Sequence, residues 1–320
     1  MKKALITGIT GQDGPYLAEF LLEKGYDVVG TYRRTSHKSF ERLEAFDILD
    51  KVDVVRADLT DQISLNKVIK DTKPDEVYNL AAQSFVGVSF EQPILTSNVT
   101  GLGAIRLFEA VKEFSPDSKI YQASSSEMFG NSDEIKNEDS RLHPASPYGI
   151  AKVFAHKSAQ HYREAYGMFI SSGILFNHES PYRGLEFVTK KITSAIGNII
   201  SKKQDKIILG NIKAKRDWGF AGDYVKAMWL MLQQKTADDY VIATGKSYSV
   251  EYFLEKAFNF SGLGDWKDYV EISEKYMRPS DIDNLVGDAS KAKQELNWEP
   301  EMPFEKLVKL MVDSDLSNIK

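Results

Sequence analysis

KALITGITGQDG, residues 3–14, is the stretch that decides the fold. Its first part, Lys3–Thr7, is apolar and predicts a short buried strand, whereas Asp13–Lys24 carries apolar residues at helical spacing and predicts a helix. The glycines between them allow a tight turn whose backbone N–H groups can face a pyrophosphate at the positive end of the helix dipole. This order of strand, glycine turn and helix predicts a dinucleotide-binding unit.

The rest of the first half continues the alternation of strand and helix. We expect further strands at Asp27–Tyr32, Val52–Arg56, Glu76–Leu80, Lys119–Ala123 and Met168–Leu175, and helices at Gln62–Lys70, Ile94–Glu113 and Pro147–Tyr166. This pattern predicts an α/β fold, a doubly wound parallel sheet that is Rossmann-like. We assign residues 1–176 to that domain and 177–320 mainly to a smaller C-terminal substrate-binding lobe. A strand–helix segment near 217–245 is expected to return to the sheet.

Composition narrows the class of protein. The 320 residues include no cysteine, which excludes disulfides, thiolate zinc sites, iron–sulfur clusters and a cysteine nucleophile. The net charge of −5 argues against nucleic-acid binding through bulk charge. The longest apolar run, Ala227–Leu232, is far too short for a membrane span, so we expect a soluble, cytoplasmic protein. No two of the five histidines have ligand spacing on one element, so no metal site is predicted.

The residues after the second predicted strand indicate which dinucleotide binds. An NAD site usually places Asp or Glu there, but this chain has Arg33, Arg34, Thr35 and Ser36. Two guanidinium groups and two hydroxyls suit a 2′-phosphate, so we predict NADP; the alternative is a solvated basic turn. Other predicted cofactor contacts lie in the glycine turn and after the third and fourth strands: Gly8, Thr10, Gly11, Gln12, Asp13, Asp58, Leu59, Leu80, Ala81, Ala82 and Ser84.

Four residues form the predicted chemical end of the site. Tyr148 and Lys152 stand four apart on one helix, so they share a face, and the ammonium is expected to lower the pKa of the phenol. Such a tyrosine can move a proton at a sugar hydroxyl while Lys152 holds the nicotinamide ribose. Ser125, at the end of a strand, can hydrogen-bond a substrate oxygen, and Glu127 can remove a carbon-bound proton beside a new ketone. The alternative is a core tyrosine near an exposed lysine, a capping serine and a solvated acid.

Together these segments resemble the extended short-chain dehydrogenase/reductase family and, within it, the GDP-mannose 4,6-dehydratases. The resemblance covers nearly the whole chain, and its most discriminating parts are GILFNHESP at 173–181 and RDWG at 216–219. It implies catalytic roles for Ser125, Glu127 and Tyr148, with Lys152 supporting Tyr148 and the cofactor. It also implies cofactor contacts for His178 and Arg183, and contacts to the substrate nucleotide for Asn177, Lys191, Arg216 and Arg278.

The resemblance implies an NADP-dependent lyase that converts GDP-mannose to GDP-4-dehydro-6-deoxy-mannose. Two enzymatic alternatives stay open, a GDP-manno-heptose 4,6-dehydratase and a GDP-4-keto-6-deoxy-sugar reductase or epimerase. A non-catalytic NADP-sensing protein is the alternative from another class. Phe85 and Tyr182 replace residues frequent in the family near the sugar, which bears on the choice of hexose or heptose. Helices Ile94–Glu113 and Pro147–Tyr166 are apolar on more than one face. The resemblance implies that such helices pair across a two-fold axis, so a homodimer or homotetramer is expected; the alternative is core packing within the monomer.

Overall fold

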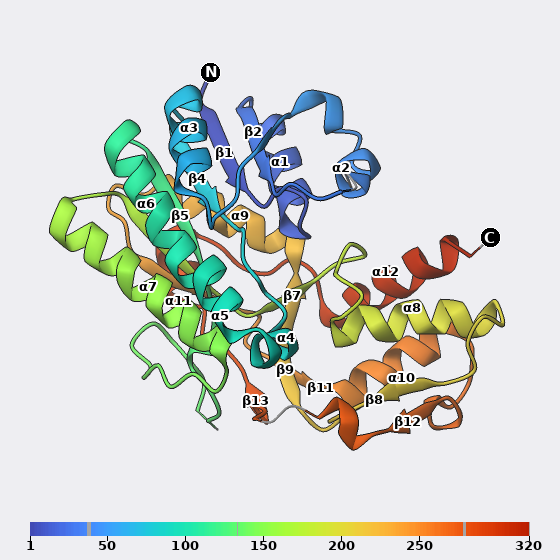
Figure 1. Cartoon of the computed structure of the whole chain (residues 1–320). Coiled ribbons are helices and arrows are strands. Elements are labelled where there is room, and N and C mark those ends of the chain that lie inside the picture. The colour runs from blue at the N-terminus through green and yellow to red at the C-terminus, as the bar shows by residue number, and fades with distance from the viewer. Residues whose placement is uncertain (37–39, 133, 278–279, 320) are drawn as a thin grey trace.

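A parallel sheet carries the amino-terminal half of the chain in the computed structural model, which describes residues 1–36, 40–132, 134–277 and 280–319. Its seven strands have the order β3-β2-β1-β4-β5-β6-β10. All neighbours are parallel, and the direction of winding reverses between β1 and β4 (Figure 1). The strands are β1 (Lys3–Thr7), β2 (Asp27–Tyr32), β3 (Asp53–Arg56), β4 (Glu76–Asn79), β5 (Lys119–Ser125), β6 (Ile170–Leu175) and β10 (Asp239–Ile242).

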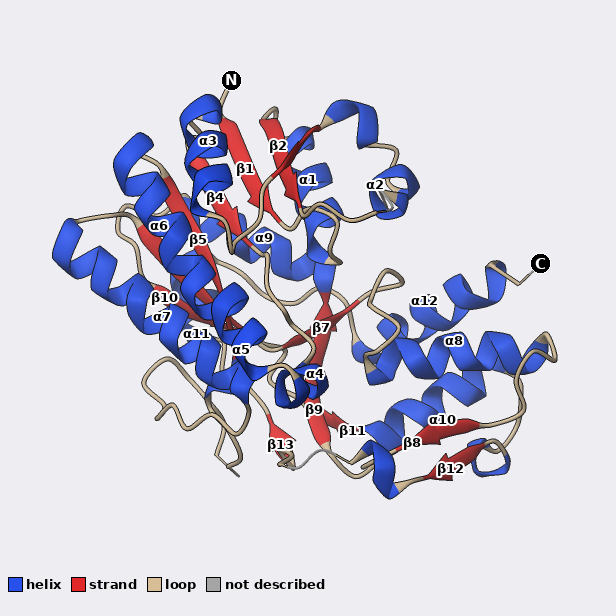
Figure 2. Cartoon of the chain, in the orientation of Figure 1, coloured by secondary structure: helices blue, strands red, loops and turns tan. Residues whose placement is uncertain are grey.

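Helices cover both faces of this sheet, as expected for buried parallel strands (Figure 2). Each face has its own apolar core. One face carries α1 (Asp13–Glu23), α9 (Ala221–Leu232) and α11 (Ser290–Leu296), and the other α3 (Gln62–Thr72), α6 (Gly103–Phe114) and α7 (Pro147–Tyr166). The predicted α/β, doubly wound fold is confirmed. Short pieces connect these layers: α2 (Glu41–Ala45), η1 (Leu49–Lys51) and η3 (Ser126–Met128).

Helix α7, which carries two predicted catalytic residues, has strong local end signals. The hydroxyl of Ser146 accepts a hydrogen bond from the backbone N–H of Gly149 at 3.0 Å, and Pro147 occupies the first helical position. Gly167 ends the helix with a φ of 66°, in the left-handed region. The bounds predicted from these residues therefore agree with the structure.

The segment predicted as one helix at Ile94–Glu113 is not one regular α-helix. After α4 (Val86–Glu91), the chain forms α5 (Pro93–Thr96), a π-helical stretch η2 (Ser97–Leu102) and then α6. The glycines in this segment lie in close contacts: a Cβ at Gly103 would be 2.8 Å from Cβ of Leu59, and one at Gly101 would be 3.2 Å from Cδ1 of Phe154. Tertiary packing of this kind is not visible in the spacing of apolar residues.

A second group of elements lies beside the carboxyl ends of the sheet, at the lower right of Figure 1. Its core is separate from the two cores of the sheet. The strands are β7 (Asn177–Glu179), β8 (Ile207–Leu209), β9 (Lys215–Phe220), β11 (Ser247–Ser249), β12 (Val270–Ile272) and β13 (Asn284–Leu285). The helices are α8 (Val188–Ile200), α10 (Val250–Ser261), η4 (Trp266–Asp268), η5 (Glu274–Tyr276) and α12 (Phe304–Ser317). None of the helices described has the length and apolarity to cross a membrane.

Candidate active site

A cleft of about 1080 Å³ lies between the carboxyl ends of the sheet strands and the second group of elements. It collects residues from distant parts of the chain. The predicted site residues that line it are Gly8, Thr10, Gly11, Gln12, Asp13, Arg33, Asp58, Leu59, Leu80, Ala81, Ala82, Ser84, Ser125, Glu127, Tyr148, Lys152, Asn177, His178, Arg183, Lys191 and Arg216. Arg34, Thr35 and Ser36 are exposed and do not line the cleft, and Arg278 lies outside the described residues.

The glycine turn after β1 leaves room for a ligand phosphate. Gly8 has a φ of 71°, and a Cβ there would lie 2.9 Å from Cα of Ala81. The N–H of Gly11 donates to the carbonyl of Gly8 at 2.9 Å, which closes the turn. A Cβ at Gly14 would lie 2.2 Å from the carbonyl oxygen of Ile9, so α1 can begin this close to the turn only with glycine. The side chain of Gln12, the N-cap residue of α1, makes no capping bond, which leaves the first N–H groups of the helix to a phosphate, so the residues fit a dinucleotide.

A polar cluster joins the start of α1 to β7. Asp13 and His178 pair at 2.8 Å, and Gln12 donates to Asp13 and to the carbonyl of His178, both at 3.0 Å. Ser180 donates to the side-chain oxygen of Gln12 at 3.0 Å. Burial alone would raise the pKa of Asp13 and lower that of His178, but their mutual attraction outweighs burial and shifts both pKa values the other way. This cluster therefore holds an ion pair beside the predicted cofactor site.

The four residues predicted for catalysis meet at the end of β5. Lys152 donates to the carbonyl of Ala123 at 2.7 Å, and Tyr148 lies close to Ser125. The hydroxyl of Ser125 also accepts from the backbone N–H of Glu127 at 3.2 Å, which caps η3. The sheet end and the first turns of α7 thus bring together a phenol, an ammonium, a hydroxyl and a carboxylate.

Burial sets the acidities in this group. It lowers the pKa of Lys152 to about 8 and raises that of Tyr148 to about 12, although the neighbouring Ser125 hydroxyl opposes the rise. The negative charge of Glu127 raises the Tyr148 pKa further. The sequence predicted the opposite direction for Tyr148, because it placed an ammonium four residues away and could not show how completely the phenol is buried.

The residues implied for the substrate nucleotide already have partners. Arg216 donates to the carbonyl of Ile282 at 2.6 Å and pairs with Asp281 at 3.2 Å. Lys191 donates to the carbonyl of Ile208 at 2.6 Å, and its nitrogen lies 4.4 Å from the centre of the Tyr276 ring. These contacts hold both cationic side chains in place in the wall of the cleft. Asn177 begins β7, next to the end of the sheet.

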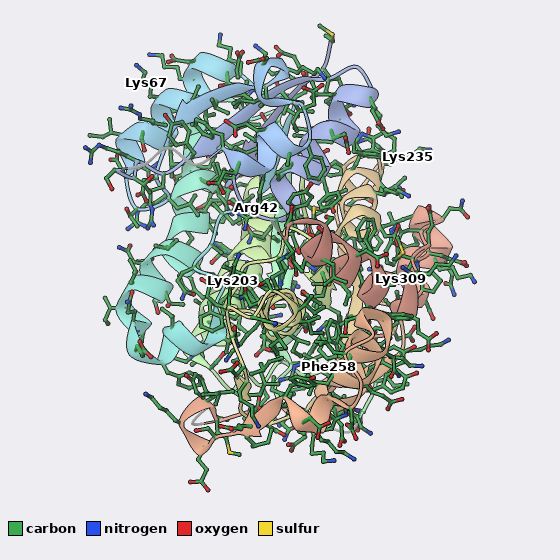
Figure 3. All side chains as sticks on the ribbon, turned by 90° about the vertical axis from the view of Figure 1, so that its right-hand side faces the viewer. Arg42, Lys67, Lys203, Lys235, Phe258 and Lys309 are labelled. Carbon is green, nitrogen blue, oxygen red and sulfur yellow. The ribbon has the colours of Figure 1, made fainter. Side chains whose placement is uncertain are left out.

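Arg42 is a cleft residue that no sequence pattern indicated. It lies on the short helix α2, and its side chain donates to the carbonyl of Thr10 at 2.8 Å and to that of Tyr182 at 3.0 Å. Figure 3 shows it where the blue amino-terminal part of the chain meets the later segments. One guanidinium thus ties the glycine turn to the loop that carries Arg183. Only the tertiary contact identifies it, because the surrounding residues 40–46 follow no motif.

Arg183 itself is held from two sides. Its Nε pairs with the buried Glu179 at 3.2 Å, and its guanidinium lies 3.7 Å from the centre of the Phe187 ring. The Phe187 ring packs edge-on against Phe85 at 5.6 Å between ring centres. Phe85, after β4, and Phe187, before α8, therefore bridge the two sides of the cleft. Among the described residues, no group of three or more His, Asp or Glu side chains is arranged to hold a metal ion.

Comparison with known proteins gives a consistent result. The family model described as GDP-mannose 4,6 dehydratase matches residues 5–311. "GDP-mannose 4,6 dehydratase 2" of Arabidopsis thaliana is 56% identical over 330 residues, with 100% of this chain and 88% of that protein covered. "GDP-mannose 4,6 dehydratase" of Homo sapiens is 46% identical, with 98% of this chain and 91% of that protein covered.

Solved structures show the same fold at low sequence identity. A dTDP-glucose 4,6-dehydratase from Bacillus anthracis in complex with NAD has a TM-score of 0.86 at 22% identity, covering 99% of this chain and 97% of that one. A protein named RMD from Pseudomonas aeruginosa, complexed with NADPH, has a TM-score of 0.82 at 20% identity and full coverage of both chains. These two likenesses show the fold of this chain.

Proposed function

The chain belongs to the GDP-mannose 4,6-dehydratase family, and from that membership and the cleft we propose that it converts GDP-mannose to GDP-4-dehydro-6-deoxy-mannose with bound NADP. The enzyme class, a dehydratase, follows from the family. The substrate, the preference for NADP and the residue roles are the proposal. The heptose dehydratase, the reductase or epimerase and the NADP sensor remain as outcomes of the test.

The observation that carries the proposal is the place of Glu127. Its carboxylate is nine-tenths buried beside Tyr148, and Lys152 and Ser125 complete the group. Oxidising an alcohol needs only the tyrosine, the lysine and a hydroxyl. A carboxylate at this place adds a base for a carbon-bound proton, which an elimination of water requires.

The chain's own residues account for the proton movements. Tyr148 acts as the phenolate, whose charge Lys152 stabilises, and takes the proton of the C4 hydroxyl while Ser125 hydrogen-bonds that oxygen. The C4 ketone acidifies the C5 proton, which Glu127 removes and passes to the C6 hydroxyl, so that water leaves. Tyr148 then returns its proton to C5, and both side chains end in their starting state. A bound nicotinamide supplies the reversible hydride acceptance that oxidises C4 and later reduces C6.

The proposed cofactor contacts follow the cleft wall. The glycine turn and the first turn of α1 would bind the pyrophosphate, and Lys152 the nicotinamide ribose. Arg33 lines the cleft at the end of β2, where the adenosine ribose of a dinucleotide lies, and it supports NADP over NAD. Arg34, Thr35 and Ser36 follow on an exposed segment, and we propose that they contact the 2′-phosphate beside Arg33.

We also propose that two copies pair through α5, η2 and α7. Ile94, Leu102, Ile150 and Phe154 lie there with exposed fractions of 82, 45, 57 and 45%. These segments pack side by side on one face of the molecule (Figure 1). Apolar side chains concentrated on one face suit a self-complementary interface of a homodimer or homotetramer. Sedimentation of the protein and of Phe154→Lys tests this, with a lower mass expected for the variant.

Product analysis tests the function directly. Purified protein with GDP-mannose and NADP is expected to give a product lighter by one water, with no net change in NADPH absorbance. With deuterium at C4 of the sugar, the label is expected at C6 of the product. Net NADPH consumption would indicate a reductase, faster turnover of the GDP-heptose a heptose dehydratase, and NADP binding without turnover a sensor. Deuterium in the solvent would overturn the proposed route.

A further inference from the structure

A third side chain of α7 lies in line with the two that the proposed reaction uses. Tyr148, Lys152 and His156 follow one another at intervals of four residues, so they share one face of the helix. They face three consecutive residues at the end of β5: Lys152 binds residue 123, His156 binds residue 124, and Tyr148 lies close to residue 125. The distance from Nδ1 of His156 to the hydroxyl oxygen of Ser124 is 2.9 Å. His156 is only 3% exposed, and the proposed chemistry gives it no role.

The neighbours of His156 decide which ring nitrogen carries the proton. Nε2 of Gln160 lies 2.6 Å from Oδ2 of Asp239 and 3.2 Å from Nε2 of His156. Asp239 also pairs with Arg163 at 2.6 Å, so it is a carboxylate and must face the NH₂ side of the amide. Nε2 of His156 itself lies 3.8 Å from Oδ2 of Asp239, too far for a hydrogen bond. The same NH₂ group therefore donates to Nε2 of His156, which is unprotonated. Burial of the ring also lowers the pKa of His156 against the attraction of Asp239, and the charges of Lys157 and Arg163 on α7 lower it further.

The hydrogen of the neutral ring is then on Nδ1 and points to Ser124. Because Ser124 accepts this bond, its own hydroxyl hydrogen is free to donate elsewhere. Among the described residues, no second side chain contacts that hydroxyl. Ser124 lines the cleft between Ala123 and Ser125, so the free hydrogen is available to a ligand there.

We propose that His156 is a positioning residue of the reaction: by donating to Ser124 it fixes that hydroxyl as a donor to an oxygen of the ligand bound at the end of β5. The inference rests on the proposed function. This role also explains the chain of hydrogen bonds that runs from Ser124 through His156 and Gln160 to Asp239. Arg163 pairs with Asp239 at the end of that chain. A buried hydroxyl held in this way has its direction set before the ligand arrives, which avoids an ordering cost on binding.

The tautomer can be measured without any turnover. Histidine-selective nitrogen NMR of the whole protein has five ring systems to resolve, and the resonance missing in His156→Asn assigns His156. We expect a proton on Nδ1 and none on Nε2 between about pH 6 and 8. A proton on Nε2, or a charged ring in this range, would overturn the inference.

Two substitutions at His156 separate positioning from packing. Asn places an amide nitrogen near the position of Nδ1 and keeps the donor to Ser124, whereas Leu is closer in size to the ring but cannot donate. We expect His156→Leu to lower kcat by about 5- to 10-fold, the worth of one neutral hydrogen bond, with the KM for the GDP-sugar little changed. His156→Asn is expected to stay within about twofold of the parent in kcat, even though it leaves more empty volume. If activity instead follows size, with Leu above Asn, the role is packing and the proposal fails.

A double-mutant cycle tests whether His156 acts through Ser124. Ser124→Ala should lower kcat as much as His156→Leu, and the double variant should be no worse than either single one. Additive losses, or a normal Ser124→Ala, would contradict the proposal. His161→Leu, at an exposed position on the same helix, serves as the matched control and should equal the parent. Thermal unfolding of each variant shows whether it is folded. Failure of the proposed function would appear separately, as no water loss from GDP-mannose by the parent.

Discussion

Two buried glutamates lie at opposite ends of the same sheet and differ in how many hydrogen bonds their carboxylates accept. Glu76 begins β4 at the amino end and is 1% exposed; Glu127 follows β5 at the carboxyl end and is 9% exposed. The carboxylate of Glu76 accepts four side-chain hydrogen bonds, from Lys2 at 3.1 Å, Tyr26 at 3.0 Å, Gln233 at 3.2 Å and Tyr78 at 2.7 Å. Within the described part of the chain, nothing donates to the carboxylate of Glu127.

This difference separates a structural acid from a reactive one. A buried carboxylate whose lone pairs are all satisfied stabilises the fold and cannot accept another proton without losing those bonds. A buried carboxylate without donors costs stability but keeps its lone pairs for a substrate. At the amino end of the sheet the buried carboxylate therefore stabilises the fold, and at the carboxyl end it has lone pairs left to bind a substrate.

The largest effect expected is on activity at the carboxyl end. Glu127→Gln removes the base but keeps the shape, so kcat on GDP-mannose should fall by roughly 10³-fold. The free energy of unfolding should not fall, because no hydrogen bond to the carboxylate is lost. Steady-state kinetics and urea unfolding measure the two quantities. Turnover equal to the parent would remove Glu127 from the mechanism.

The second effect is on stability at the amino end. Glu76→Ala leaves two phenols, an amide and an ammonium without their acceptor, so the free energy of unfolding should drop by about 3 kcal/mol. The kcat of the protein that remains folded should equal that of the parent. Urea unfolding measures the loss, and Glu76→Gln, which keeps one acceptor oxygen, should lose less. An equal loss of kcat would show that the two ends are coupled rather than separate.

A third variant should gain stability while losing activity. The pKa of Lys152 falls from 10.5 to about 8 through burial, so the charged form is disfavoured in the folded state. Lys152→Met removes that cost, and after the lost bond to Ala123 we expect a gain of about 2 kcal/mol at pH 7 with almost no turnover.

The pH dependence checks the sign of this gain. Between about pH 8 and 10.5 the unfolded parent binds more protons than the folded one, so the parent gains stability as pH rises. The advantage of Lys152→Met should therefore shrink over that range, as followed by chemical unfolding. An advantage that stays constant with pH would mean that the buried charge is not its cause.

The smallest effect concerns the ion pair between Asp13 and His178, which lies beside the predicted cofactor site. The pKa of His178 is raised, so its contribution is complete below its unfolded value and is lost as pH rises through the folded value. That of Asp13 is lowered, so its contribution is lost as pH falls through its folded value. His178→Gln should cost about 1 kcal/mol near pH 6 and less in alkali. Thermal unfolding tests this, with exposed His143→Gln as the control; a loss that grows with pH would reverse the assignment.

Much of the sheet was predictable because local signals agreed there. Strand positions followed from apolar runs, and β1 and β2 have the expected bounds. β5 extends two residues further than predicted, to Ser125, since the polar residues at its end pair with β6 and not with solvent. The π-helical stretch η2 was missed because apolar spacing cannot distinguish it from a regular helix. The division into domains at residue 176 stays a prediction.

For the candidate site, the sequence predicted which residues lie together better than it predicted their pKa values and hydrogen bonds. Ser125, Glu127, Tyr148 and Lys152 lie together as their motif positions predict. The direction of the Tyr148 pKa was wrong, and Arg42 and the bond between His156 and Ser124 were not anticipated. Each of these depends on the atoms that surround a side chain, and residues distant in the sequence supply most of those atoms.

The sequence by itself determined the order of elements, the glycine turn and the residue types at the strand ends, because each follows from local spacing, turn geometry and chemistry carried by a few neighbouring residues. Only the tertiary structure decided which buried acids are satisfied, which ring nitrogen of His156 carries its hydrogen and how far burial shifts the acidity of Tyr148 and Lys152. Hydrogen-bond satisfaction and desolvation are sums over every atom around a group, and most of those atoms come from segments far away along the chain.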